Sequence, residues 1–70
     1  MLIQEIGKII KERRKTLGIT QAHLAELAEV NVNTIIRIEN GKINPSMEVL
    51  HKITEVLGLE FSLGIKESKL

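Results

Sequence analysis

The sequence predicts an all-α domain of four to five helices that ends in one short β-strand. Apolar residues recur every three or four positions in four stretches before residue 60, which is the period of a helix with one buried face. Residues that favour helix starts, Thr20, Asn31 and Ser46, precede three of these stretches. From residue 61 the apolar period changes to two, which is typical of a strand.

The first two helices are expected before residue 29. The first spans residues 2–17 and ends at Gly18, because a residue without Cβ readily takes the left-handed conformation that closes a helix. The second begins after Thr20, whose hydroxyl can accept a hydrogen bond from the next turn, and runs to about Ala28. The side chains expected to be buried in these helices are Ile6, Ile10, Leu17, Leu24, Leu27 and Ala28.

The third and fourth helices are expected between residues 31 and 58. Asn31 caps the third, which ends before Gly41. Pro45 and Ser46 mark the start of the fourth, because proline suits the first turn of a helix; either Ser46 or Asn44 can cap it, and Gly58 ends it. The apolar side chains expected to face the core from these helices are Ile35, Ile38, Met47, Leu50, Ile53 and Leu57.

The break between the second and third helices is unusually short. Only Glu29 and Val30 separate the second helix from the cap of the third. Such a break turns the third helix at a steep angle to the second, and the two axes then approach at one point where only a small side chain, Ala25, fits. The N-terminal half of the third helix is therefore expected to protrude. Its outward side chains are Val32, Asn33, Thr34, Ile36 and Arg37.

These outward side chains are of the types that read double-stranded DNA. Asn pairs with adenine through two hydrogen bonds, Arg pairs with guanine in the same way, apolar groups touch the thymine methyl, and an α-helix fits the major groove. Two other interpretations stay open, a solvated face and a face covered by a protein partner. Val32 and Ile36 weigh against plain solvent, because β-branched apolar residues are unusual choices there.

The C-terminal residues follow a different pattern. Phe61, Leu63 and Ile65 alternate with small or polar residues. A single strand leaves its backbone groups unpaired, so the expected partner is a second copy of the chain, antiparallel across a two-fold axis. A short fifth helix or a frayed tail are the alternatives. We therefore divide the chain into a helical domain, 1–59, and a C-terminal strand or tail for dimerisation, 60–70.

The composition argues against several classes of function. There is no cysteine, and the two histidines have no ligand-spaced partners, so neither a metal nor another cofactor is expected. The chain has no nucleophile–base pair at a sensible spacing and no glycine-rich phosphate loop, so an enzyme is not expected. Phe61 is the only aromatic residue, too few for the stacking platforms that bind single-stranded nucleic acid. The net charge of +1 indicates no partner by itself.

Targeting signals are also not evident. The N-terminus places its charges after a short apolar run and lacks a small-residue cleavage site, unlike a signal peptide. No apolar run approaches the roughly 20 residues of a membrane span. A cytoplasmic protein is expected.

The stretch "ITQAHLAELAEVNVNTIIRIENGKINPSMEVLHKITEVLGL" resembles the helix-turn-helix domain of the lambda-repressor/Cro (XRE) family, and the likeness extends from about Ile6 to Leu59. The resemblance implies a lambda-repressor-like fold and a dimeric repressor that binds double-stranded DNA sequence-specifically. The recognition helix, about 32–40, would enter the major groove of a palindromic operator.

The resemblance also implies roles for individual residues. Among the outward residues of the third helix, those at 32, 33, 36 and 37 would face base edges, with Thr34 beside them. Gln21, Asn40 and Lys42 would bind DNA phosphates. Arg14 and Glu39 would form an ion pair between the first and third helices. The chain departs from the family at Glu29, where glycine is usual; a positive φ there would strain a non-glycine residue.

The tail carries a second, narrower resemblance. The stretch "VLGLEFSLGIKE" is similar to the end of HipB-type antitoxins, whose C-terminal strand pairs between the subunits of a dimer. This implies an alternative function, an antitoxin that mainly binds and neutralises a toxin protein and represses its own operon only secondarily.

Overall fold

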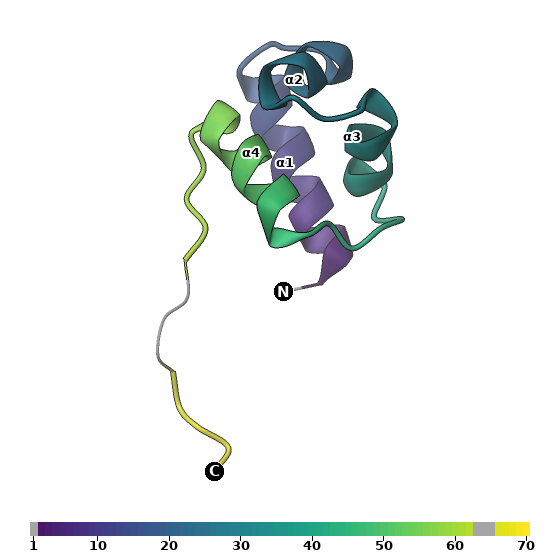
Figure 1. Ribbon diagram of the computed structural model, residues 1–70. Helices are drawn as coiled ribbons and strands as arrows, with labels where there is room; N and C mark the ends of the chain where they lie inside the picture. The colour runs from purple at the N-terminus through teal and green to yellow at the C-terminus, as the bar shows by residue number, and fades with distance from the viewer. Residues whose placement is uncertain (1, 63–65) are drawn as a thin grey trace.

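The helices that the sequence predicts are present. The computed structural model describes residues 2–62 and 66–70. In these residues it has four helices, α1 (Ile3–Thr16), α2 (Gln21–Ala28), α3 (Val32–Glu39) and α4 (Met47–Leu57), which pack around one core (Figure 1). No helix of the described residues is long and apolar enough to cross a membrane.

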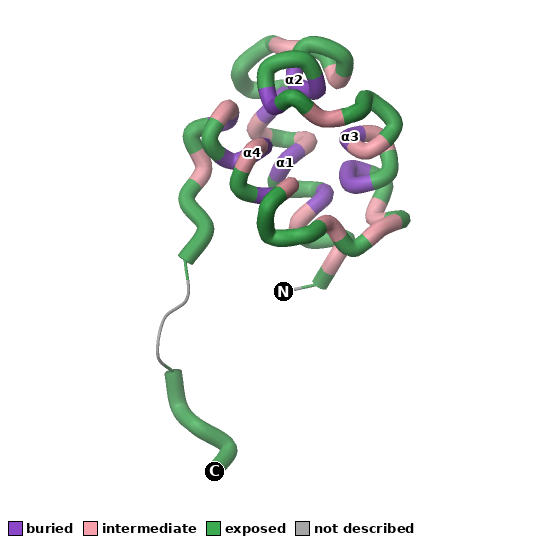
Figure 2. Tube along the Cα trace, in the orientation of Figure 1, coloured by how far each residue is buried: buried purple, intermediate pink, exposed green. Residues whose placement is uncertain are grey.

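One aliphatic core joins the four helices. Figure 2 shows that the buried segments lie on the sides of the helices that face each other. Removal of these apolar side chains from water is the main stabilisation available to so small a domain. The buried apolar residues are Ile10, Leu24, Ala25, Ala28, Ile35, Ile38, Leu50, Ile53 and Leu57.

Three of the residues expected in the core are exposed instead. Leu27 is 52% exposed because the buried side of α2 is rotated toward Ala25, which packs in the core. Met47 is 59% exposed; it is the first residue of α4 and lies one turn before the core begins at Leu50. Leu17 is exposed because α1 ends at Thr16 and leaves it outside the helix.

The three expected N-caps are confirmed. Thr20 accepts a hydrogen bond through its hydroxyl from the backbone N–H of His23 at 3.0 Å. Asn31 accepts one through Oδ1 from the N–H of Asn33 at 2.7 Å, and the Ser46 hydroxyl accepts one from the next turn of α4. Each cap satisfies a backbone donor that has no partner within its helix, so these short side chains set where α2, α3 and α4 begin.

The corner between α2 and α3 is closed by a left-handed residue. Glu29 has φ 56° and ψ 44°, the one positive φ outside glycine in the described residues. The N–H of Val30 bonds to the carbonyl of Ala25 at 3.0 Å, and the N–H of Glu29 bonds to that of Glu26 at 3.2 Å. This is the Schellman pattern of helix ends, which usually has glycine at the left-handed position. The strain expected for Glu29 is therefore present.

α1 crosses α3 at a glycine. A Cβ on Gly7 would collide with the carbonyl oxygen of Ile38, at the C-terminal end of α3. Gly7 is buried within α1, where glycine lowers helix stability relative to alanine. Because Gly7 has no Cβ, the backbones of α1 and α3 can come close at this point. This contact sets the position of α3 against the rest of the domain.

The expected C-terminal strand is not seen in the part of the tail that the structure describes. In the described residues, 60–62 and 66–70 carry no helix or strand; residues 60 and 61 lie against the helices, and 66–70 lie away from the helical body (Figure 1). Phe61 therefore lies in irregular chain, because a single copy offers no edge with which a strand could pair. Leu63 and Ile65, the other two residues of the expected strand, lie outside the described residues.

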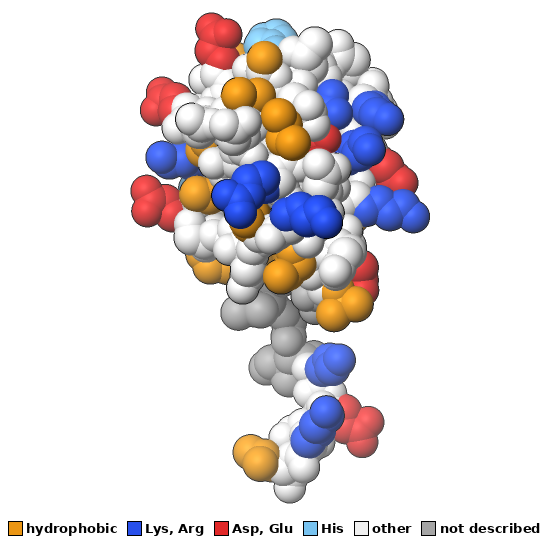
Figure 3. All heavy atoms as spheres, turned by 90° about the vertical axis from the view of Figure 1, so that its right-hand side faces the viewer, with side chains coloured by type: hydrophobic (Ala, Val, Ile, Leu, Met, Phe, Trp, Pro, Cys, Tyr) orange, Lys and Arg blue, Asp and Glu red, His pale blue; other side chains and the backbone are white. Residues whose placement is uncertain are grey.

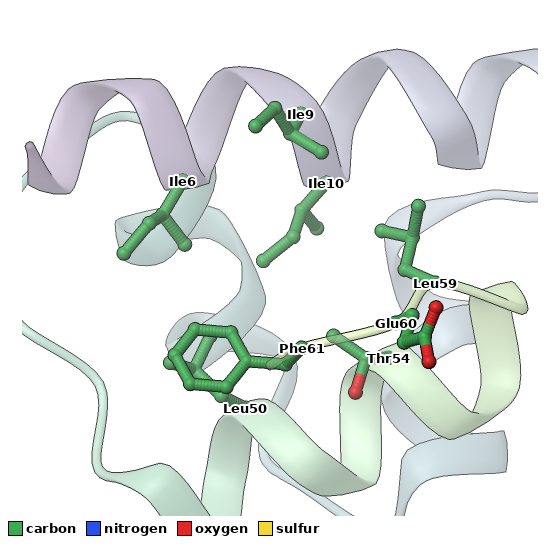
Figure 4. A pocket seen from close by; sticks show the side chains of 8 residues that line it. All are labelled: Ile6, Ile9, Ile10, Leu50, Thr54, Leu59, Glu60 and Phe61. Atoms are coloured by element: carbon green, nitrogen blue, oxygen red, sulfur yellow. The ribbon is translucent and has the colours of Figure 1, made fainter. Parts of the chain in front are cut away.

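An apolar hollow lies between α1 and α4, at the start of the tail (Figure 4). Phe61 is 46% exposed at its rim. The hollow is lined by Ile6, Ile9, Ile10, Leu50, Thr54, Leu59, Glu60 and Phe61.

Candidate nucleic-acid interface

The outer side of α3 is the candidate interface. Ile35 and Ile38 are fully buried on the inner side. Asn33 and Arg37, one helical turn apart, are exposed on the opposite side. The helix is short, and its N-terminal cap and C-terminal end are both held by hydrogen bonds, so these two side chains project from a rigid support.

The remaining residues expected to read bases flank Asn33 and Arg37. Val32 is 37% exposed at the first position of the helix. Thr34 and Ile36 are half-buried on opposite flanks, so each offers only part of its side chain to a ligand. The outer side of α3 thus combines an amide, a guanidinium and apolar groups, which are the chemical groups that distinguish base pairs in the major groove.

The residues expected to bind phosphate lie at the two ends of the helix-turn-helix unit. Asn40 is the exposed C-cap of α3, and Lys42 is exposed in the turn that follows. Gly41 between them has φ 67°, and the N–H of Lys42 bonds to the carbonyl of Arg37 at 2.8 Å. The turn is therefore ordered by backbone hydrogen bonds, and it presents an amide and an ammonium group beside the outer side of α3.

Gln21 is tied to α3 as well as to α2. It is the first residue of α2, and its Nε2 donates a hydrogen bond to Glu39 Oε1 at 3.1 Å. A side-chain amide nitrogen carries two hydrogens, so one remains for a phosphate oxygen. The positive end of the α2 dipole favours an anion at the same place.

Arg14 and Glu39 form a buried, bidentate ion pair. Arg14 Nε lies 2.7 Å from Glu39 Oε2, and Nη2 lies 3.0 Å from Oε1. The hydrogen bond to Glu39 raises the pKa of Arg14, although burial works in the opposite direction. Arg14 Nη1 also donates to the carbonyl of Ile19 at 2.8 Å. Because Gln21 reaches the same carboxylate, Glu39 connects α1, α2 and α3.

Two contacts that position these helices are not apparent from the sequence. The hydrogen bond from Gln21 to Glu39 joins residues 18 positions apart. Arg13 donates from Nε to the carbonyl of Leu57 at 2.9 Å and so holds the end of α4 against α1. Neither contact has a signature in residue spacing, since each depends on how the helices pack.

Figure 3 views the molecule from the side on which α3 lies. Lys and Arg side chains gather in the middle of this face and in a row along its right-hand edge, with acidic side chains beside that row. Among the described residues, no group of three His or Glu side chains is arranged to hold a metal ion.

The comparisons with known proteins agree with this geometry. The model of the helix-turn-helix family matches residues 10–63. A Methanothermobacter thermautotrophicus protein named as an HTH-type transcriptional regulator is 46% identical over 52 residues, which are 74% of this chain and 75% of that protein. The immunity repressor protein of Bacillus phage phi105 is 34% identical over 65 residues, which are 93% of this chain and 45% of the repressor.

A solved structure has the same arrangement of helices. The restriction-modification controller protein C.AhdI from Aeromonas hydrophila matches with a TM-score of 0.79 and 26% identity, over 83% of this chain and 88% of that chain. The family match covers most of the chain, and the Methanothermobacter protein aligns over about three quarters of both sequences. The chain therefore belongs to the helix-turn-helix family of transcriptional regulators, of the lambda-repressor-like (XRE) type, a family of DNA-binding proteins and not of enzymes.

Proposed function

We propose that the protein is a dimeric repressor that recognises a specific sequence of double-stranded DNA with the outer side of α3. The observation that carries the proposal is the pair Asn33 and Arg37, exposed on a helix whose inner residue, Ile35, is fully buried. A rigid helix that displays an amide and a guanidinium one turn apart suits direct reading of base edges. One relative is named as a phage immunity repressor, which supports repression rather than activation of transcription.

In this proposal the base-reading residues are the outward side chains of α3, and the phosphates are bound beside them. Gln21 would bind a phosphate at the start of α2, while Asn40 and Lys42 would bind phosphates at the end of α3. The base-reading set is Val32, Asn33, Thr34, Ile36 and Arg37. The ion pair of Arg14 and Glu39 would orient these groups rather than contact DNA.

The test is selection of binding sites from random duplex DNA by the purified chain. We expect enrichment of a two-fold symmetric sequence whose half-site centres are about 34–36 Å apart, one helical turn of DNA. The selected site is then placed before a reporter gene, where the protein should lower expression. Recovery of random sequences only, at all salt concentrations, would contradict sequence-specific recognition.

We propose further that the subunits of the dimer pair through their tails. Phe61 is a half-exposed aromatic side chain at the rim of an apolar hollow, and the alternating residues Leu63 and Ile65 follow it in the sequence. Two tails paired antiparallel would satisfy each other's backbone groups and cover this apolar surface. The mass in solution of the full chain and of a chain ending at Leu59 tests this. A shorter chain that stays dimeric would contradict tail pairing.

The alternative function, an antitoxin that neutralises a toxin protein, stays a prediction from the tail sequence. The Methanothermobacter and phage relatives are named as a transcriptional regulator and a repressor, which favours DNA recognition as the primary function. A neighbouring toxin gene whose product forms a stable complex with the purified chain would favour the antitoxin.

A further inference from the structure

The basic residues of α1 divide into two groups. Arg14 is neutralised by Glu39, and Arg13 is bound to the end of α4, so both are used by the fold. The other three are Lys8, Lys11 and Lys15. Within the described part of the chain, none of these lysines has a carboxylate within 4.0 Å. Lys8 and Lys15 are exposed and Lys11 is half-buried, so three cations are left on the surface of α1 without a structural partner there.

The three lysines lie in one row on the helix. Together with Gln4 they occupy positions separated by four, three and four residues, which is the spacing of one side of an α-helix. Lys8 and Lys15 are seven residues apart, about 10 Å along the axis. A row of this length spans about three base-pair steps of 3.4 Å along a DNA strand.

The row begins at the turn that follows the recognition helix. A Cβ built on Gly41 would lie 3.0 Å from Gln4 Cγ, so the first turn of α1 packs against this turn. Gly41 stands between Asn40 and Lys42, the two proposed phosphate ligands. From Gln4, Lys8 is one turn farther along the same side of α1 and Lys11 about two. The lysine row therefore starts beside the turn that holds Asn40 and Lys42 and runs from there along α1.

The side of α1 that contacts α3 lies next to the lysine row. Gly7 touches the end of α3, and Arg14, seven residues later on the same side, pairs with Glu39. Lys11 lies between them in sequence, turned about 40° from Gly7 on an ideal helix. The lysines thus flank the contact of α1 with α3, at the border of the recognition face.

A solvated ion-pair surface is the competing explanation. Glu5 and Glu12 lie three residues before Lys8 and Lys15, a spacing at which helix surface pairs form. The described structure contains no such pair on α1, whereas α4 does contain one, Lys52 with Glu48 at 3.9 Å. The acidic residues occupy the next side of α1 and leave the lysine row continuous.

We propose that Lys8, Lys11 and Lys15 bind a second run of DNA phosphates, outside the bases that α3 reads. This inference rests on the proposed function and extends it. In addition to α2 and α3, α1 would bind DNA, and the protein would contact a longer segment of one DNA strand. Recognition of phosphates carries no sequence information, so the row should add affinity and salt dependence but no base preference.

The test compares two variants with the same loss of charge. One carries Lys8→Gln, Lys11→Gln and Lys15→Gln; the control carries His51→Glu and Lys52→Glu on α4, which also lower the net charge by three and lie outside the proposed DNA-binding and dimerisation residues. Binding to the selected DNA site is measured from about 50 to 200 mM salt. Each neutralised phosphate contributes about 0.9 to the slope of log K against log salt. Three lost phosphate contacts should make the slope of the α1 variant shallower by about 2.7 per subunit. The control should have the same slope as the unmodified chain.

DNA length gives a second readout. A duplex cut back to the base-reading site should bind the unmodified chain more weakly than a duplex with flanking base pairs, and the α1 variant should bind both equally. Base preference should be the same for all three proteins. If the α1 variant unfolds below the assay temperature, a double variant, Lys8→Gln with Lys15→Gln, replaces it, because both positions are exposed. Its slope should be shallower by about 1.8.

The outcomes separate this inference from the proposed function. If the unmodified chain binds DNA and the α1 variant and the control lose the same slope, only net charge matters and the lysine row is not a binding site. An α1 variant that keeps the full slope would likewise exclude the row as a binding site. If the unmodified chain binds no DNA, the proposed function itself fails, and the inference with it.

Discussion

Arg14 and Glu39 meet in a buried, bidentate ion pair that joins the end of α1 to the end of α3. The Glu39 side chain is 1% exposed and that of Arg14 is 11% exposed. Loss of either partner would leave the other charge buried without compensation, which is far more costly than loss of a surface pair. The pair also receives the amide of Gln21, so one carboxylate controls the relative placement of three helices.

Arg14→Ala should therefore lower the free energy of unfolding strongly, by about 3–5 kcal/mol. Urea denaturation followed by circular dichroism measures this. Lys52→Ala is the control, because it breaks an exposed pair and should cost less than about 1 kcal/mol. Equal effects of the two substitutions would show that the buried pair does not stabilise the domain.

Arg37→Ala should weaken binding to the selected DNA site by about 1–3 kcal/mol and loosen base preference at one position of each half-site. The reason is that a guanidinium aimed at a guanine edge discriminates between base pairs. Lys42→Ala is the comparison, since a phosphate ligand should weaken binding equally on all sequences. Titrations of both variants against a panel of single-base changes distinguish them, and a uniform loss for Arg37→Ala would reassign this residue to the DNA backbone.

Gln21→Ala should weaken DNA binding uniformly while leaving the fold in place. The substitution removes one hydrogen bond to Glu39, but both bonds from Arg14 remain, so we expect a stability loss of about 1–3 kcal/mol. Gln21→Glu should destabilise more, because it sets a second carboxylate against Glu39. Thermal melting measures the stability, and titration with DNA at one salt concentration measures the affinity. An affinity of Gln21→Ala for the selected DNA site equal to that of the unmodified chain would exclude a phosphate contact by this side chain.

Glu29→Gly should stabilise the protein by about 0.5–1 kcal/mol. Glycine removes the strain of a left-handed side-chain residue, although it also increases the entropy of the unfolded chain. Glu29→Ala is the control: it removes the charge, keeps the Cβ and should leave stability nearly unchanged. Denaturant midpoints of the three proteins measure the difference, and an equal gain for Gly and Ala would assign the effect to the charge.

Gly7→Ala should destabilise the domain by about 1–3 kcal/mol, the usual cost of overpacking. The added Cβ meets the backbone of Ile38, which cannot move without shifting α3. Lys8→Ala, at the next and exposed position of α1, should be nearly neutral for stability. A Gly7→Ala protein as stable as the unmodified chain would mean that α1 can move away from α3 at little cost.

The fold was largely predictable because its helix ends depend on nearby residues. Thr20, Asn31 and Ser46 cap through their own side chains, and Gly18 and Gly58 both take positive φ at the ends of their helices. Burial was less predictable. Leu27 and Met47 follow the helical period but are exposed, because the period does not say which side the neighbouring helices cover.

The tail shows a second limit of local reasoning. The alternation around Phe61 is a pattern that a strand requires, but a strand also requires a partner at its edge. In the described residues 60–62 no such partner is present and no strand forms. The pairing of two chains is an intermolecular property, and no spacing within one chain decides it.

The sequence by itself determined the four helices, the short corner between α2 and α3, and which side of α3 is turned outward, because each depends on residues within about ten positions of one another. Only the tertiary structure decided that Gln21, Arg14 and Glu39 share one buried carboxylate site, that Gly7 lets α1 touch α3, and that the first turn of α1 packs against the turn after α3. These relationships join distant segments. They follow from packing, because the burial of one common core sets how the four helices lie against each other.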